Sequence, residues 1–315
     1  SVTIISMLEN CDRSTFYEIY FLVSERFMQS KEDILENLLT KYDNFSIEYI
    51  TVDENIFNNA KTTNYHVTVE TYYRLIISEV LKEYDRCLYL DCDLIVNTDL
   101  NELLNIDMEN CYIAGVLDNG MQCGKGSYYS KHSVELGFSD MHSYINAGVL
   151  VMNLALIRSD NMTDIFLKHM QRGYSIEDQD VLNVTCKEKI KYLPLYYNVF
   201  NAFYGTEELK NCKYYNKEEI KNVLDGNIKI IHYAGNTPKP WKSLKCKLGD
   251  NWWKYAAKSP ETSLLSQIKE EVSMLEDQRS WKRLLEACRE KKDIVIFGYS
   301  NIGRKVYLDL QKAGI

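Results

Sequence analysis

The sequence predicts an α/β fold with a mainly parallel sheet that is flanked by helices. Short apolar segments of strand length alternate along the chain with segments of helical periodicity. Several of the apolar segments are followed directly by an aspartate or a histidine. Ligands bind outside the carboxyl ends of the strands in sheets of this kind, so these polar residues are the first candidates for a functional site.

The predicted elements follow one another in a regular order. Apolar residues at helical spacing occupy 1–8 and 34–39, and a longer helix is predicted over 67–81. Strands are predicted over 16–23, 46–52, 86–90, 111–117, 148–152 and 229–232. The residues that follow Leu90, Leu117 and Ile231 are therefore expected at the ligand-binding edge of the sheet.

Changes of character divide the chain into three parts. A pattern typical of one or two amphipathic helices begins near residue 263, and 293–297 reads as a new strand followed by a glycine-containing turn. That turn lacks the middle glycine of a dinucleotide-binding motif. We predict a main domain over 1–258, a helical linker over 259–290 and the truncated start of a Rossmann-like domain over 291–315.

The composition argues against several classes of protein. A net charge of -8 disfavours a general nucleic-acid binder, because such proteins carry a basic surface. No apolar segment reaches the roughly 18 residues that a membrane-spanning helix needs. The nine cysteines lack zinc-site or paired spacing, which favours reduced thiols and a cytoplasmic location. A polyanionic ligand must then be held by a metal ion or by a few well-placed cations.

The segment 239–258 mixes tryptophans with lysines and has two interpretations. It could contact an anionic membrane surface from the cytoplasmic side. It could also be an aromatic cluster that packs on the main domain and leaves its lysines in solvent. The second interpretation is favoured, because the segment has no clean amphipathic period.

The sharpest local feature is the pair Asp91 and Asp93 at the end of an apolar strand. Side chains two residues apart in a strand point to the same side, and two carboxylates there repel each other unless a cation lies between them. Oxygen ligands of this kind select Mg²⁺ or Mn²⁺. A solvated turn after a strand is the plainer alternative, since Asp-x-Asp alone is a common pattern.

A second segment strengthens the metal hypothesis. His232 ends the last predicted strand of the main domain, and Gly235 and Lys239 follow it. Prolines on both sides of Lys239 stiffen that loop, and Gly235 permits close approach of the backbone. One histidine with two aspartates forms a mixed nitrogen and oxygen site that suits Mn²⁺.

These segments and two others resemble family 8 of the glycosyltransferases, which are retaining enzymes of the GT-A fold. The likeness covers roughly residues 1–255, and the family includes bacterial lipopolysaccharide glucosyl- and galactosyltransferases. The likeness rests on Tyr89 to Asp93 with the helix of Glu70 to Leu75 before it, and on His232 to Trp241. The two further segments are Tyr144 to Leu154 and the acidic Glu177 to Asn183. The family's first strand is missing ahead of Ser1, and its absence would leave backbone groups of the sheet unpaired. This absence and the abrupt end at Ile315 indicate a fragment of a longer protein.

The resemblance implies a role for each matching residue of the metal and phosphate site. Asp91, Asp93 and His232 would ligate Mn²⁺ (or Mg²⁺), which bridges the diphosphate of a UDP-sugar. Gly235 and Lys239 would contact the phosphates.

The resemblance also assigns the donor-sugar side. Arg74 would reach toward the diphosphate and the sugar, and Asp118 would hold a hydroxyl of the donor or the acceptor. The sugar pocket would be lined by Asn146, Ala147 and Gly148. Plainer roles are a turn cap for Asp118 and a pair with Glu70 one helical turn away for Arg74.

Two residues of the acidic segment would complete the catalytic side. Asp178 and Gln179 would flank the anomeric carbon, where an amide oxygen and a carboxylate suit a ring with oxocarbenium character. Asp178 could instead only complement the dipole of a helix. No residue is an evident nucleophile, which favours substitution on the face that the leaving phosphate occupies, with that phosphate as the base.

The resulting hypothesis is a metal-dependent retaining hexosyltransferase that uses UDP-glucose or UDP-galactose and a hydroxyl acceptor on a glycan. Its expected partners are the nucleotide sugar and the glycan acceptor, with no nucleic acid. One alternative is a non-catalytic module that binds nucleotide sugars. Another is a phosphatase of the haloacid-dehalogenase type, whose Asp-x-Asp motif usually opens the chain and continues with threonine or valine where Ile95 stands.

Overall fold

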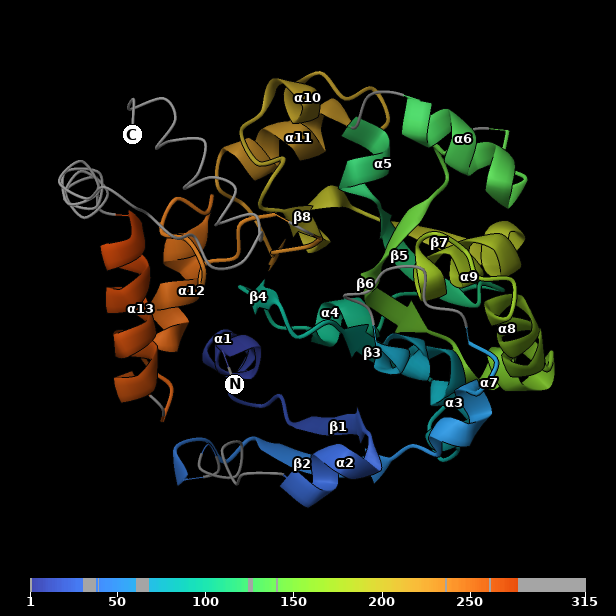
Figure 1. Cartoon of the computed structure of the whole chain (residues 1–315), viewed down its shortest axis with the longest axis horizontal. Coiled ribbons are helices and arrows are strands. Elements are labelled where there is room, and N and C mark those ends of the chain that lie inside the picture. The colour runs from blue at the N-terminus through green and yellow to red at the C-terminus, as the bar shows by residue number, and fades with distance from the viewer. Residues whose placement is uncertain are drawn as a thin grey trace, which may run out of the picture.

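A computed structural model describes residues 2–30, 38, 40–60, 68–123, 127–139, 141–235, 237–260 and 262–276. Figure 1 shows most strands in the middle of the molecule and β1 and β2 at its lower edge, with α7, α8 and α9 on one side and α1, α12 and α13 on another. Most of the predicted helical segment 34–39 lies outside the described residues. The predicted strand 293–297 and the glycine-containing turn after it lie outside them too.

The N-terminal part forms a small parallel sheet. Strand β1 (Tyr17–Val23) pairs in parallel with β2 (Phe45–Thr51) over their whole lengths. Helix α1 (Val2–Glu9) precedes β1, and α2 (Glu25–Ser30) follows it. The sequence predictions for 1–8, 16–23 and 46–52 are therefore confirmed, although most of β1 is only partly buried.

The central sheet has the order β3-β6-β5-β7. Its strands are β3 (Cys87–Leu90), β6 (Ile145–Met152), β5 (Ile113–Leu117) and β7 (Ile190–Leu193). The sequence predicts a mainly parallel sheet, and three of these strands do share one direction, but β6 runs antiparallel to both of its neighbours. The reason lies in the connection from β5 to β6. Asp118 N–H donates to the Tyr144 carbonyl, so the chain leaves and re-enters the sheet at the same edge.

The third sheet brings distant segments together. It has the order β4-β9-β8, with β4 (Leu94–Val96), β9 (Ile230–His232) and β8 (Val199–Phe200). Strand β4 starts directly after Asp93, and its antiparallel register with β9 pairs Leu94 with His232. This register places His232 beside the Asp91-Cys92-Asp93 turn.

Side chains of α1 and of Asn10, which follows it, bond to the outer edge of β4. Thr3 Oγ1 donates to the Leu94 carbonyl at 2.9 Å, and Asn10 Nδ2 donates to the Val96 carbonyl at 3.0 Å. The Val96 N–H donates to Ser6 Oγ at 2.9 Å. The backbone groups of this edge of β4 are therefore satisfied at Leu94 and Val96 by side chains.

Helices and short helical turns surround the sheets. The predicted helix over 67–81 is confirmed as a 3₁₀ segment that continues into α3. The remaining elements are η2 (Glu54–Phe57), η3 (Val69–Ile76), α3 (Ile77–Val80), α4 (Asn101–Leu104), α5 (Asn119–Cys123), α6 (Ser127–Leu136), α7 (Leu154–Ser159), α8 (Met162–Met170), α9 (Glu177–Cys186), η4 (Lys187–Lys189), η5 (Leu195–Tyr197), α10 (Glu207–Lys210), α11 (Lys217–Leu224), α12 (Gly249–Ala256) and α13 (Thr262–Glu276).

Strand β6 lies at the centre of the core, and every one of its residues is buried. Its alternate side chains belong to two hydrophobic clusters, with Val149 and Val151 in one and Leu150 and Met152 in the other. Each such side chain contributes about 1.5–3 kcal/mol through burial. The strand that carries three predicted sugar-pocket residues is therefore among the best anchored of the chain.

The aromatic segment near the C-terminal end of the main domain packs inward. Trp252 and Tyr255 of α12 are buried in the core, and the Trp241 ring lies 5.4 Å from the Trp252 ring between centroids. This arrangement confirms the packing interpretation of the segment. No helix among the described residues combines the length and the apolar character that a membrane span requires.

Candidate active site

Three predicted metal ligands meet although two of them are far from the third in sequence. Asp91, Asp93 and His232 each offer a ligand atom, and these atoms lie within 4.8 Å of one another. His232 Nε2 is 3.2 Å from Asp93 Oδ1 and 3.6 Å from Asp91 Oδ2. Two carboxylate oxygens and an imidazole nitrogen at this spacing can hold a Mn²⁺ or Mg²⁺ ion.

Each of the two carboxylates also pairs with a cation. Lys239 Nζ lies 2.8 Å from Asp93 Oδ2, and Arg74 Nη2 lies 3.2 Å from Asp91 Oδ1. Burial opposes ionisation of Asp93, but a hydrogen bond from the protonated His232 ring and the charge of Lys239 outweigh it and lower its pKa to about 2. Two positively charged side chains, Lys239 and Arg74, therefore lie where the sequence predicts a diphosphate and a metal ion.

The guanidinium of Arg74 is held by groups from three other segments. Nε pairs with Asp178 at 2.9 Å, and Nη1 donates to the Ala147 carbonyl at 2.6 Å. The group also lies over the Tyr89 ring, 4.3 Å from its centroid. Arg74 therefore bridges the aspartate pair and the acidic segment, and the alternative pair with Glu70 is not what holds it.

Gly148 lies where a side chain would enter the predicted metal site. A Cβ at this position would lie 2.7 Å from Asp91 Oδ2 and still closer to His232 Cε1. Real Cβ atoms do not come that near to other heavy atoms. Only glycine at this position of β6 lets the aspartate and the imidazole approach each other.

A buried polar network continues from Gly148 toward the acidic segment. Asn146 Nδ2 donates to Asp118 Oδ2 at 3.1 Å and to Gln179 Oε1 at 2.8 Å. Gln179 Nε2 donates to Asp118 Oδ2 at 3.2 Å, and Gln179 Oε1 also accepts from the Ala147 N–H at 2.9 Å. Burial raises the pKa of Asp118. The structure thus joins four of the residues predicted for the sugar pocket and the catalytic side.

Asp118 and Asp178 each serve the fold as well. Asp118 Oδ1 accepts from the Met121 N–H at 3.0 Å, which is the turn-capping role considered above. Asp178 lies in the first turn of α9 and accepts from Thr71 Oγ1 at 2.6 Å. Burial raises the pKa of Asp178, and the charge of Arg74 works against that shift. The structural and the functional readings of these two residues are therefore compatible.

Gly235 has a backbone reason to be glycine. Its φ of +65° lies in the left-handed region, which a side chain strains. A Cβ there would meet nothing within 4 Å, so space is not what excludes other residues. The turn lets the chain reverse after Ala234 and bring Lys239 back to Asp93.

Some residues of the site carry no signal in the sequence. Asn198 is fully buried and bonds to both Asn146 and His232. Tyr89 OH donates to Asp91 Oδ1 at 2.9 Å while its ring supports Arg74. Asn198 precedes a two-residue strand and belongs to no recognisable motif. Tyr89 looks like an ordinary strand residue.

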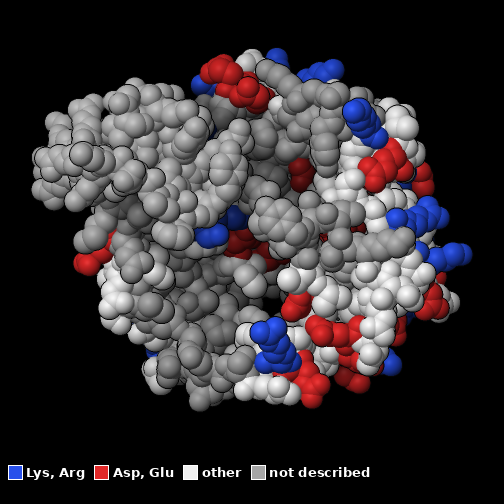
Figure 2. Space-filling model, in the orientation of Figure 1, with Lys and Arg blue, Asp and Glu red and all other residues white. Residues whose placement is uncertain are grey.

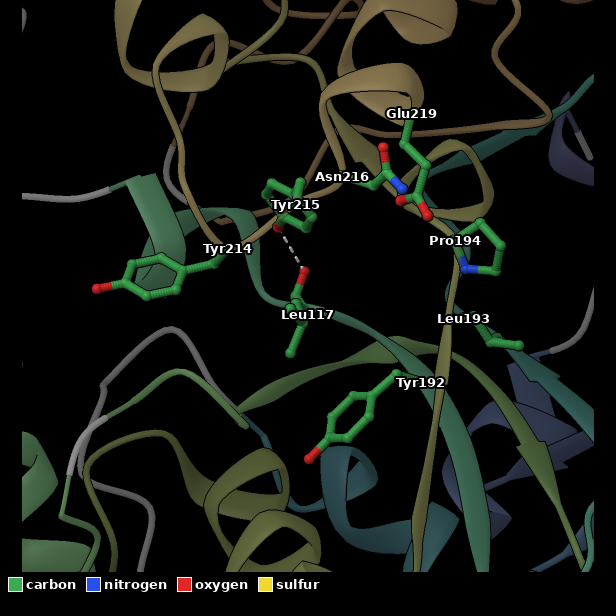
Figure 3. Close-up of a pocket in the computed structure, with 8 residues that line it drawn as sticks. All are labelled: Leu117, Tyr192, Leu193, Pro194, Tyr214, Tyr215, Asn216 and Glu219. Atoms are coloured by element: carbon green, nitrogen blue, oxygen red, sulfur yellow. Dashed lines mark hydrogen bonds between the residues drawn. The ribbon is translucent and has the colours of Figure 1, made fainter.

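A separate cavity of about 200 Å³ begins at Leu117, the residue before Asp118 (Figure 3). Two of its polar groups are engaged within the fold. Tyr215 OH donates to the Leu117 carbonyl at 2.8 Å, and Glu219 Oε2 accepts from the Leu195 N–H at 3.0 Å. The cavity has no lysine or arginine in its lining, so it does not suit a diphosphate.

Figure 2 shows acidic side chains recessed near the middle of one face, with basic side chains beside them.

Comparison with known families decides the class of the protein. The profile described as "Glycosyl transferase family 8" matches residues 1–245, which is most of the chain. The chain belongs to glycosyltransferase family 8. It is therefore an enzyme, a glycosyltransferase, and neither the phosphatase nor the non-catalytic module considered above.

Several curated glycosyltransferases are similar to this chain. A putative glycosyltransferase of Haemophilus influenzae is 28% identical over 258 residues, which covers 79% of this chain and 72% of that protein. A lipopolysaccharide 1,2-glucosyltransferase of Escherichia coli is 28% identical, with 76% and 68% covered. A lipopolysaccharide 1,3-galactosyltransferase of Salmonella typhimurium is 26% identical, with 82% and 76% covered.

Solved structures agree with the predicted fold class. The bifunctional glycosyltransferase WbbM matches with a TM-score of 0.69 and 25% identity, over 85% of this chain and 48% of that one. This chain thus spans about half of WbbM. The galactosyltransferase LgtC, solved with donor and acceptor sugar analogues, matches with a TM-score of 0.63 and 22% identity, over 82% and 91%. The GT-A-type α/β fold expected from the sequence is confirmed, whereas the domain boundaries and the individual roles of the site residues stay predictions.

Proposed function

We propose that this family 8 enzyme is a metal-dependent, retaining hexosyltransferase. It would move glucose or galactose from a UDP-sugar to a hydroxyl group of a glycan, in the synthesis of bacterial lipopolysaccharide or another surface polysaccharide. The observation that carries the proposal is the meeting of Asp91, Asp93 and His232 beside Lys239 and Arg74. The lipopolysaccharide glucosyl- and galactosyltransferases among its relatives support the donor and the acceptor class.

The donor set fits a hard divalent cation. Two carboxylate oxygens and one imidazole nitrogen suit Mn²⁺, and Mg²⁺ is the alternative. Such an ion, when bound, would stabilise the charge that grows on the leaving diphosphate. Lys239 and Arg74 would bind phosphate oxygens from the protein side, and the Gly235 turn would bring the loop of Lys239 against them.

The buried network supports the sugar side of the proposal. Both acceptor positions of Gln179 Oε1 are filled by Asn146 and the Ala147 N–H, so the amide is rigidly oriented. Asp118 is held in the same network by Asn146 and Gln179. We assign Asp118 to a sugar hydroxyl, and Gln179 with Asp178 to the surroundings of the anomeric carbon.

The engagement of the carboxylates supports a retaining course that forms no covalent intermediate. Asp178 is tied to Arg74 and Thr71, and Asp118 is tied to Asn146 and Gln179. Neither carboxylate is therefore free to attack the sugar. The acceptor oxygen would bond to the anomeric carbon on the face from which the phosphate departs. The sugar–phosphate bond breaks, and the departing phosphate accepts the hydroxyl proton.

The decisive experiment combines donor choice with metal removal. Purified protein is incubated with UDP-glucose, UDP-galactose or another UDP-sugar, and release of UDP is followed with and without an added glycan acceptor. We expect release only with Mn²⁺ or Mg²⁺ present, loss after chelation, and recovery when the ion is restored. Turnover that persists at full rate after chelation would refute metal dependence, and activity with a different nucleotide would refute the UDP assignment.

Lys239 allows a second test with opposite effects on two ligands. Its ammonium competes with a cation for Asp93, at 2.8 Å from Oδ2. We expect Lys239→Met to bind Mn²⁺ more tightly than the wild type when no nucleotide is present. The same variant should bind UDP more weakly when Mn²⁺ is saturating, because the phosphates lose a partner. Calorimetry measures both affinities.

The matched control for this test is Lys242→Met, which removes an equal charge from an exposed position of the same loop. Both affinities should stay at wild-type values in the control. If Lys239→Met weakened Mn²⁺ binding, or left UDP binding unchanged, the assigned role of Lys239 would be wrong.

A further inference from the structure

We infer that Asn198 is a positioning residue that fixes the tautomer of His232. Asn198 Oδ1 lies 2.9 Å from His232 Nδ1, on the side of the ring away from the aspartates. The inference rests on the proposed metal site, because it concerns how one of the three ligands is oriented. Metal-binding histidines generally donate the hydrogen of their other ring nitrogen to a fixed acceptor.

The direction of each hydrogen bond follows from a backbone group. Gly148 N–H can only donate, and it points at Asn146 Oδ1 at 2.9 Å, so that atom of Asn146 is the oxygen. The Asp118 carboxylate, which accepts from Asn146 Nδ2 at 3.1 Å, fixes the same orientation from the other end. No rotation of the Asn146 amide satisfies both of these partners in the reverse sense.

The Asn146 oxygen then fixes the next amide. It lies 2.8 Å from the side chain of Asn198, which must present its NH₂ group there and its oxygen to His232. His232 Nδ1 must therefore carry a hydrogen and donate it to Asn198. The lone pair of a neutral ring is left on Nε2, the nitrogen that lies near Asp93 and Asp91.

Burial makes this relay hard to bypass. Asn198 is 0% exposed and His232 is 2% exposed, so water does not easily replace a lost partner. A buried donor or acceptor without a partner costs about 1–3 kcal/mol. The relay also connects the predicted sugar pocket, through Asn146, to the metal ligand His232. A change in the orientation of the Asn146 amide would thus alter the hydrogen bond of His232 through Asn198, although Asn146 and His232 are not bonded to each other.

The test measures the tautomer and the metal affinity separately. Metal-free protein with ¹⁵N-labelled histidine is examined by NMR at alkaline pH, where the imidazole is neutral. We expect the wild type to carry its hydrogen on Nδ1 of His232, and Asn198→Leu to shift it to Nε2. Mn²⁺ alone, titrated into nucleotide-free protein and followed by electron paramagnetic resonance, should bind about 10- to 100-fold more weakly to Asn198→Leu.

Two further variants separate positioning from general damage. Asn198→Asp keeps an oxygen that accepts from Nδ1, although its second oxygen then faces Asn146 Oδ1. It should retain the Nδ1 tautomer and bind Mn²⁺ more tightly than Asn198→Leu does. Asn201→Leu removes a side chain of the same type that is also buried and contacts the Pro238 carbonyl and Cys246. It should leave the tautomer and the Mn²⁺ affinity of the protein unchanged. Circular dichroism confirms that each variant is folded.

The outcomes distinguish this inference from the proposed function. A wild-type His232 with its hydrogen on Nε2, or an Asn198→Leu variant with unchanged tautomer and Mn²⁺ affinity, would overturn the inference. A wild type that holds the Nδ1 tautomer but binds no Mn²⁺ would instead overturn the metal site of the proposed function and leave the relay supported.

Discussion

Asp93→Asn is expected to abolish sugar transfer and hydrolysis of the UDP-sugar while the chain stays folded. The substitution keeps the shape of the side chain and one oxygen, but removes the charge that faces His232 and Lys239. Metal ions and placed cations supply several kcal/mol of transition-state stabilisation, and each 1.4 kcal/mol or so is about tenfold in rate. A loss of about a hundredfold or more is therefore the expected result, measured as UDP release with saturating Mn²⁺.

The same variant has a signature in stability that does not depend on activity. In the folded chain the pKa of Asp93 is lowered from 3.8 to about 2, so its ionised form stabilises the fold. That contribution is complete above about pH 4 and disappears as the pH falls through about 2. The difference in unfolding free energy between wild type and Asp93→Asn should shrink in the same range. Full transfer activity in the variant would contradict the role of Asp93 in metal binding.

Gly148→Ala should be nearly as damaging, although it changes no polar group. The added Cβ would lie 2.7 Å from Asp91 Oδ2 and 3.0 Å from Asn146 Oδ1, and closer still to the His232 ring. Asn198 bonds to the far side of the His232 ring and keeps it in place. The clash must therefore displace Asp91 or strand β6. We expect Mn²⁺ affinity to fall at least about tenfold, as seen when ligand geometry is disturbed, and transfer to fall with it.

Gly115→Ala is the matched control, because it adds the same group to the neighbouring strand. Its Cβ would meet the side-chain ends of Ile145 at 2.7 Å and Leu150 at 3.1 Å, away from the ligands. Overpacking of this kind typically costs about 1–3 kcal/mol of stability. The control should lose stability to a similar extent yet bind Mn²⁺ normally. Equal Mn²⁺ binding by Gly148→Ala and wild type would show that the site tolerates the extra atom.

Much of the fold and of the site could be predicted from local patterns. The Asp91-Cys92-Asp93 turn follows an apolar strand, and His232 ends another, so the carboxyl ends of strands pointed to both. The same rule pointed to Asp118 after β5. The reversal of β6 was not predictable from its sequence, since an apolar strand reads alike in either direction. The return of the chain from Asp118 to Tyr144 decides that direction, and this is a tertiary contact.

The supporting residues of the site could not be predicted for a different reason. Asn198 and Tyr89 act through hydrogen bonds and ring contacts that exist only in the folded chain. Neither residue type is unusual in a strand or a turn, and the partners Asn146 and His232 of Asn198 are distant in sequence. The crowding around Gly148 is likewise invisible until His232 of β9 meets Gly148 of β6, although a glycine in a strand does signal close approach of other atoms.

The register that pairs Leu94 with His232 has a thermodynamic consequence for the whole domain. Asp91 follows a strand of the central sheet, whereas His232 belongs to the separate sheet of β4, β8 and β9. An ion shared by the two would bind only while both sheets are docked, so its binding energy adds to the cohesion between them. At a concentration one hundred times the dissociation constant, that linkage amounts to about 2.7 kcal/mol. The ion used in catalysis would then also stabilise the docking of these two sheets against each other.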